Sequence, residues 1–120
     1  MKKLVEIAKF TKKIEEMSAF YENLLGTAPA ARSEGMAIFM IGAVKLFLHA
    51  FYEQKEGDLP PENHLAFEVP NVIQACDELV QAGLKIEVPP KEYYWGYSAY
   101  LRDPDGQMIE LIEADQVQTN

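Results

Sequence analysis

The chain has 120 residues, of which 48% are hydrophobic and 25% are charged, with 11 basic and 19 acidic residues giving a net charge of −8. This length predicts a single domain that can bury a core without disulfides or structural metals. The negative charge repels a phosphate backbone and argues against a nucleic-acid or polybasic membrane contact, so the expected partner is a small-molecule substrate or ligand, or a protein.

The first half of the chain predicts one helix between strands. The segment after Thr11, a candidate N-cap, carries apolar residues at spacings of three and four and ends at Gly26, which predicts a helix of about four turns. Its apolar positions are Ile14, Met17, Tyr21 and Leu24. Strands are expected over residues 3–10, 36–42 and 44–51, with a short weak strand near residues 28 to 33.

The second half repeats this order. Asn71, with Gln74 three places on, resembles a capping box, and the helix that it opens is expected to end at Gly83. The expected core-facing stripe of this helix consists of Val72, Ile73, Cys76, Leu79 and Val80. Strands are expected over residues 64–69, 84–88, 96–102 and 107–113, and the tight turn 103–106 joins the last two.

Cys76 is the single cysteine of the chain, so an internal disulfide is ruled out. Its place in the apolar stripe predicts a buried structural thiol rather than a reactive one. A lone cysteine suits a reducing compartment, and no apolar run approaches the roughly 20 residues of a membrane span. We therefore expect a cytoplasmic protein with no membrane contact.

The order β-α-β-β-β is thus written twice, which predicts an α+β protein. We expect a single domain over residues 1–120, made of a module 1–52 and a module 62–114 with a connector 53–61.

The closing strands of the two modules can be overlaid by setting Gly42 on Gly106. This overlay places Leu46 opposite Glu110, and His49 follows three residues later.

Three polar residues stand in segments whose composition predicts burial: Glu6, His64 and Glu110. Because an unpaired buried charge is costly, such residues are usually paired, hydrogen-bonded or bound to a metal. One histidine and two carboxylates suit divalent zinc, nickel, manganese or iron, with positions left open for water or substrate. Solvation of Glu6 at a sheet edge is the alternative.

The segments "FYENLLG", "HLAFEV" and "YWGYSAYLRDPDGQMIELIE" resemble the vicinal oxygen chelate superfamily, which contains glyoxalase I, extradiol dioxygenases, methylmalonyl-CoA epimerase, and fosfomycin- and bleomycin-resistance proteins. The resemblance covers essentially the whole chain. It implies two βαβββ modules in a cup-shaped, eight-stranded mixed sheet, often completed by a homodimer. It further implies a divalent metal at the ends of the first, fourth, fifth and eighth strands, which chelates two adjacent oxygens of the substrate.

Carried over by position, the resemblance makes Glu6, His64 and Glu110 metal ligands. The fourth-strand position falls on Leu46, which cannot bind a metal, so His49 is the candidate fourth ligand if the strand carries a bulge. By similarity to glyoxalase I, Glu110 or Glu6 is the catalytic base. The expected activity is that of a metal-dependent lyase, isomerase or dioxygenase-like enzyme.

A metal-free ligand-binding protein, similar to the bleomycin-resistance proteins, is the alternative function. It rests on the aromatic stretch at residues 93–100, where flat rings suit a planar cationic ligand, although cross-strand pairs or a dimer contact are the preferred explanation for most of these rings. Trp95, Tyr97 and Arg102 are the candidate substrate-pocket residues, with Arg102 suited to an anionic group.

Overall fold

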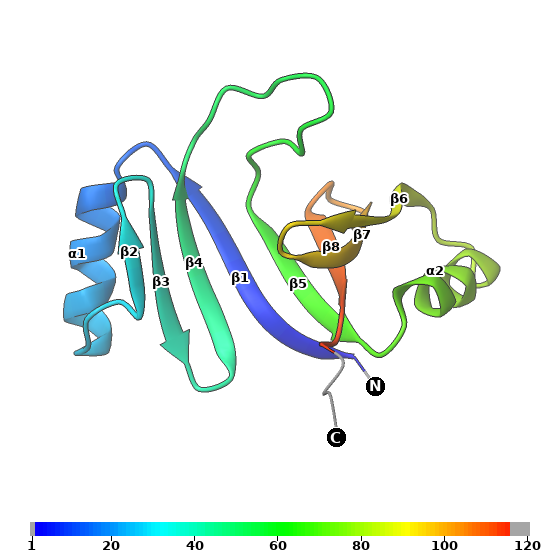
Figure 1. Ribbon diagram of the computed structural model, residues 1–120, viewed down its shortest axis with the longest axis horizontal. Coiled ribbons are helices and arrows are strands. Elements are labelled where there is room, and N and C mark those ends of the chain that lie inside the picture. Colours follow the sequence, from blue (N-terminus) through cyan, green and yellow to red (C-terminus); the bar gives the residue numbers. More distant parts are fainter. Residues whose placement is uncertain (1, 116–120) are drawn as a thin grey trace. The chain divides into compact units, whose positions relative to one another are not determined.

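The computed structural model describes residues 2–115, which form two compact units. Residues 5–64 form the N-terminal unit, and residues 2–4 together with 65–115 form the C-terminal unit. Each unit contains one helix and the greater part of four strands (Figure 1). Neither helix of the described residues is long and apolar enough to cross a membrane.

The N-terminal unit runs β-α-β-β-β along the chain. Its strands lie in the order β2-β3-β4-β1, with β1 parallel to β4 and the other neighbours antiparallel. The elements are β1 (Lys3–Thr11), α1 (Ile14–Leu25), β2 (Ala31–Ser33), β3 (Met36–Ile41) and β4 (Val44–Ala50).

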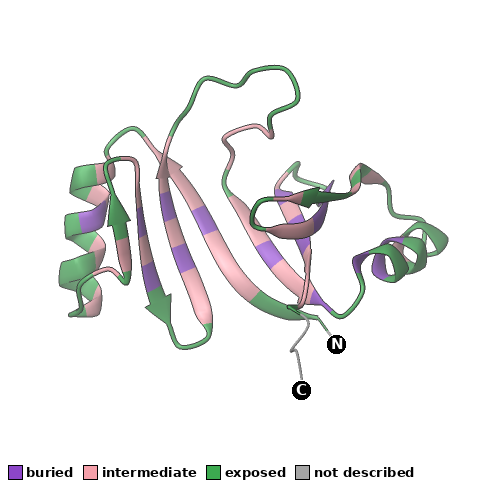
Figure 2. Cartoon of the chain, in the orientation of Figure 1, coloured by how far each residue is buried: buried purple, intermediate pink, exposed green. Residues whose placement is uncertain are grey.

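Helix α1 covers one face of this unit's strands. Its apolar side packs against a buried cluster of β3 and β4 residues, whose burial is visible as bands across these strands (Figure 2). The cluster consists of Ala37, Phe39, Leu46 and Leu48, packed by Ile7 of β1 and by Ile14, Met17, Tyr21 and Leu25 of α1. The prediction that Leu24 belongs to this stripe is wrong, because Leu24 is 64% exposed and Leu25 packs instead.

The ends of α1 agree in part with the sequence signals. Gly26 adopts the left-handed conformation at φ 71° and its N–H donates to the carbonyl of Glu22, which ends the helix as predicted. The N-cap is Lys13 rather than Thr11. Thr11 is the last residue of β1, and its hydroxyl accepts a hydrogen bond from the Lys13 N–H at 2.9 Å.

The C-terminal unit repeats the order of elements. Its strands lie in the order β5-β8-β7-β6, and β7 pairs antiparallel with both β6 and β8. The elements are β5 (His64–Val69), α2 (Val72–Gln81), β6 (Ile86–Tyr93), β7 (Gly96–Arg102) and β8 (Met108–Glu113). The first residue of β5, His64, groups with the N-terminal unit.

Helix α2 begins as predicted, because the Asn71 side chain accepts a hydrogen bond from the Gln74 N–H at 2.9 Å. Its buried face differs from the predicted stripe. Val72, Ala75 and Cys76 are buried and Leu79 packs beside them, whereas Ile73 and Val80 are 53% and 55% exposed. The spacing of 3.6 residues per turn explains the difference, since a face centred on residues 72, 75, 76 and 79 turns residues 73 and 80 outward together.

The fold class predicted from the sequence is confirmed. The chain is an α+β protein of two βαβββ modules, with parallel and antiparallel strands and, within residues 2–115, two helices.

Candidate functional site

The side chains of β1 and β4 alternate between two faces. Ile7 and Leu46 are register partners, and both belong to the cluster packed against α1. The neighbouring register partners Glu6 and Lys45 therefore lie on the opposite face, which α1 does not cover.

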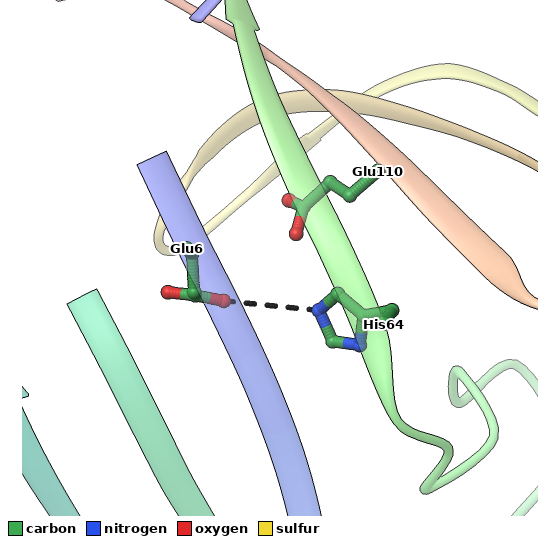
Figure 3. Close-up of side chains that lie close together, drawn as sticks. All are labelled: Glu6, His64 and Glu110. Carbon is green, nitrogen blue, oxygen red and sulfur yellow. Dashed lines mark ion pairs between the residues drawn. The ribbon is translucent and has the colours of Figure 1, made fainter. Parts of the chain in front are cut away.

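Glu6 and His64 approach each other on this face. The Glu6 Oε2 atom lies 3.7 Å from Nε2 of His64, and their side chains are 19% and 13% exposed (Figure 3). The Nδ1 atom of His64 lies 3.0 Å from the carbonyl oxygen of Glu62. Because a carbonyl only accepts, Nδ1 carries a proton, and this directs Nε2 toward Glu6 as the nitrogen suited to hold a metal.

Glu110 belongs to the C-terminal unit and is 4% exposed. Its Oε2 atom accepts hydrogen bonds from the Ser98 hydroxyl at 2.8 Å and from the Trp95 indole N–H at 3.1 Å. Leu111, the next residue, packs in the cluster against α2, so Glu110 lies on the face opposite α2. The carboxylate in an apolar strand is thus buried but hydrogen-bonded.

Tyrosine side chains surround this carboxylate. Tyr100 is the register partner of Glu110 and is fully buried. Burial first, and then the negative charge of Glu110, raise the pKa of Tyr100 well above its usual range. The same two causes raise the pKa of Tyr93, whose ring stacks on Trp95 at 4.5 Å with an interplanar angle of 7°. Both phenols therefore stay protonated at neutral pH.

The fourth-strand position differs from the sequence overlay. Leu46 is 4% exposed and packs against α1, in the same way that Leu111 packs against α2. The predicted overlay, which set Leu46 on Glu110, is therefore wrong by one residue, because Leu46 corresponds to Leu111. On the face of Glu6, β4 presents Lys45, whose Nζ lies 3.9 Å from the Glu6 Oε1 atom.

Aromatic rings surround His49, the candidate fourth ligand. It lies on the same face of β4 as Lys45, and its ring centroid is 5.4 Å from those of Phe10 and Phe47. Its Nδ1 atom is 2.6 Å from the carbonyl oxygen of Ala50. These contacts place His49 in an aromatic group whose Phe10 ring also lies 6.5 Å from the His64 ring, and its role as a fourth ligand stays a prediction.

The three predicted pocket residues lie in different surroundings. Trp95 is 40% exposed and contacts Glu110, whereas Tyr97 packs in the cluster beside α2. The Arg102 Nε atom donates to both carboxylate oxygens of Glu87 at 3.0 and 3.1 Å. The structure thus brings together Trp95 and Glu110, but not Tyr97 or Arg102 with them.

Two residues of the site were not predicted from the sequence. Ser98 donates to Glu110 across neighbouring strands, and its only sequence signal is a polar residue alternating with apolar ones in "GYSAYLR". Lys45 has the same kind of signal in "VKLFLHA", where it precedes the core residue Leu46.

The donor set fits a transition metal. Within the N-terminal unit, His64 offers an imidazole nitrogen and the half-buried Glu6 offers carboxylate oxygens; within the C-terminal unit, the buried Glu110 offers a carboxylate. Mixed nitrogen and oxygen donors suit zinc, nickel, manganese or iron, whereas calcium and magnesium prefer oxygen alone.

Comparison with known proteins identifies relatives over most of the chain. A model of the Glyoxalase/Bleomycin resistance protein/Dioxygenase superfamily matches residues 3–111. A virulence protein of Salmonella typhimurium is 31% identical over 103 residues, which cover 78% of this chain and 72% of that protein.

Solved structures share the fold. A hypothetical protein from Bacillus halodurans matches with a TM-score of 0.75 at 20% identity, covering 99% of each chain. A methylmalonyl-CoA epimerase of Streptomyces coelicolor matches with a TM-score of 0.70 at 18% identity, covering 98% of this chain and 97% of that one. At these identities the structures establish the fold alone. Together with the family model, they lead to one conclusion: the chain belongs to the glyoxalase/bleomycin resistance protein/dioxygenase superfamily.

Proposed function

We propose that this protein is a divalent-metal-dependent enzyme, a lyase, isomerase or dioxygenase, that acts on a small molecule with two adjacent oxygen atoms. Glu6, His64 and Glu110 would hold the metal, which is zinc, nickel, manganese or iron. The observation that carries the proposal is the Glu6–His64 pair, in which the half-buried Glu6 carboxylate lies 3.7 Å from Nε2 of His64 while Nδ1 lies against the Glu62 carbonyl oxygen.

Glu110 supports the proposal from the second module. Burial of a carboxylate that is 4% exposed costs free energy unless the carboxylate is hydrogen-bonded, paired with a cation or bound to a metal. Ser98 and Trp95 hold its Oε2 atom, and such outer contacts orient a metal ligand and fix its direction. The proposal therefore treats Ser98 and Trp95 as positioning residues.

When bound, a divalent cation would polarise the substrate oxygens as a Lewis acid. The residues of the chain then have separate tasks. Glu6 and Glu110 are the two candidate bases, because each carboxylate can receive a proton from a carbon next to a polarised carbonyl. The buried environment of Glu110, between Tyr100 and Trp95, excludes water from that carboxylate.

Activity screening tests the proposal. Chelator-treated protein should be inactive toward α-ketoaldehyde–thiol adducts, epoxides and catechols, and zinc, nickel, manganese or iron should restore turnover of one class. Glu6→Gln and Glu110→Gln should each abolish this turnover, and Glu15→Gln, an exposed glutamate of α1, is the matched control. Turnover that survives both chelation and the two substitutions would contradict the proposal.

A metal-free ligand-binding protein is the second candidate, and the hairpin between β6 and β7 favours it. Tyr94 is 98% exposed and its ring centroid lies 4.7 Å from that of Trp95, which itself stacks on Tyr93. Flat exposed rings suit a planar cation. Fluorescence of Trp95, the sole tryptophan, should be quenched by planar cationic compounds if this role is correct. Unchanged fluorescence with every compound tested would count against it.

The homodimer and the cytoplasmic location remain predictions, as does the single domain over residues 1–120. Large apolar side chains exposed on α1, Phe20 at 58% and Leu24 at 64%, support a protein contact there. The free buried thiol of Cys76 suits a reducing compartment. The mass of the protein in solution, measured by sedimentation, tests the dimer.

A further inference from the structure

A row of side chains on β4 lies outside the core and outside the proposed metal set. Leu46 and Leu48 pack against α1, so Lys45, Phe47 and His49 present themselves on the other face. Lys45 is the register partner of Glu6, which places this row next to the Glu6–His64 pair.

The Lys45 ammonium forms a weak ion pair with Glu6. Its Nζ lies 3.9 Å from Glu6 Oε1, which is longer than a hydrogen bond, and its side chain is 43% exposed. A partly exposed ion pair of this kind contributes little to stability, so the ammonium can turn to a ligand at small cost. A metal on Glu6 would weaken this ion pair further, because both cations compete for the same carboxylate.

Beside Lys45, Phe47 begins a group of rings. The His49 ring lies between those of Phe10 and Phe47, and Tyr52 lies 6.0 Å from both Phe10 and His49. Tyr52 and its neighbour Phe51 remain 37% and 49% exposed. Of these rings, Phe47 is the one that lies two residues from Lys45 on the same face of β4, and it is partly exposed. A partly exposed ring beside a cation favours a ligand that is flat and apolar at one end and negatively charged at the other.

We propose that Lys45 and Phe47 form a binding site for a small aromatic carboxylate, with the Lys45 ammonium holding the carboxylate and the Phe47 ring lying against the flat body. A monoanion fits better than a phosphate dianion, because repulsion by the Glu6 carboxylate, 3.9 Å from the Lys45 ammonium, grows with the negative charge of the ligand. The inference names the substrate class. That the bound carboxylate is a substrate of this protein rests on the proposed function.

Titration calorimetry with three probes tests the site. Phenylacetate carries both the ring and the charge, phenylacetamide keeps the ring without the charge, and acetate keeps the charge without the ring. Wild-type protein should bind phenylacetate about tenfold more tightly than either of the other two, as expected for one charge-assisted hydrogen bond and one ring contact.

Substitutions assign the preference to named atoms. Lys45→Met keeps the apolar stem and should make phenylacetate and phenylacetamide bind equally, whereas Lys45→Arg should keep the preference. Phe47→Leu should weaken both aromatic probes and leave acetate unchanged. Lys12→Met, at an exposed lysine just after β1, removes one charge elsewhere and is the control.

The outcomes separate this inference from the proposed function. A preference for phenylacetate that persists in Lys45→Met, or no binding of phenylacetate to the wild type at millimolar concentrations, overturns the inference. Zinc content measured on the same samples tests the metal site by itself. Zinc binding without a Lys45-dependent preference leaves the proposed function standing, and a Lys45-dependent preference without any metal supports the inference and contradicts the metal enzyme.

Discussion

Glu110 has a different environment from an ordinary strand carboxylate. Two donors from β7 and the hairpin before it, Ser98 and Trp95, converge on one of its oxygens, and Tyr100 lies opposite it in register. Hydrogen bonds to a buried carboxylate offset its desolvation and fix its direction. A small change in these donors should therefore alter metal binding before it alters the fold.

Ser98→Ala tests this positioning. Loss of the 2.8 Å hydrogen bond should weaken metal affinity by about tenfold, the lower end of the range for an outer contact of a ligand. Competition with a chromophoric chelator measures the affinity. Ser98→Thr keeps the hydroxyl and should recover most of it, while Ser33→Ala, in exposed β2, is the control. Equal affinity in Ser98→Ala and wild type would show that Ser98 does not position Glu110.

Cys76 gives a second prediction at this scale. Burial and then the neighbouring Asp77 raise the pKa of its thiol. A raised pKa means less thiolate at any given pH, and the thiolate is the reactive form. Native protein at pH 8 should therefore react with iodoacetamide far more slowly than denatured protein, as followed by mass spectrometry. Equal rates would contradict the buried assignment.

At the scale of elements, periodicity and turn residues predicted each of the ten helices and strands of the described residues, with the largest error at β6, which was expected over residues 84–88 and runs over Ile86–Tyr93. The sequence did not predict the rotation of α2 about its own axis or the faces on which the side chains of β4 lie. Ala75, too small to count in an apolar pattern, belongs to the buried face of α2, and this moved the predicted stripe toward Ile73 and Val80. A one-residue error in the overlay likewise exchanged the faces of β4, because side chains alternate along a strand.

The cap of α2 provides the prediction for an element. Asn71→Ala removes the hydrogen bond to the Gln74 N–H and should lower the free energy of unfolding by about 1 kcal/mol. Urea denaturation measures the change. Asn71→Asp should be nearly neutral because its carboxylate also caps, and Asn23→Ala, at an exposed residue inside α1, is the control. An unchanged midpoint in Asn71→Ala would show that the cap contributes nothing.

At the scale of the whole molecule, the repeat in the sequence was the most informative signal. It located Glu6, His64 and Glu110 as polar residues in matching strands. The partners of Glu6 and Glu110 could not be predicted, because they lie far away along the chain. Trp95 and Ser98 lie 15 and 12 residues from Glu110 along the chain, and the Lys45–Glu6 contact depends on the parallel pairing of β1 with β4.

The two histidines provide a matched pair for a stability test. A ligand that binds only the folded state stabilises it, so zinc should raise the thermal midpoint of the wild-type protein and of His49→Ala. The same addition should leave His64→Ala unchanged, although this variant should still unfold cooperatively without zinc. A zinc-dependent shift that is lost in His49→Ala and kept in His64→Ala would reverse the assignment of the metal ligand.

The central claim is that Glu6, His64 and Glu110 bind one divalent metal, and the stoichiometry of metal binding tests it most directly. Chelator-treated, tag-free protein should be titrated with zinc, nickel, manganese and iron(II), and the bound metal measured by elemental analysis. We predict about one ion per chain at micromolar concentration for at least one metal, and none for His64→Ala or Glu110→Gln. No binding by the wild type, or the same binding by these two variants, would contradict the account.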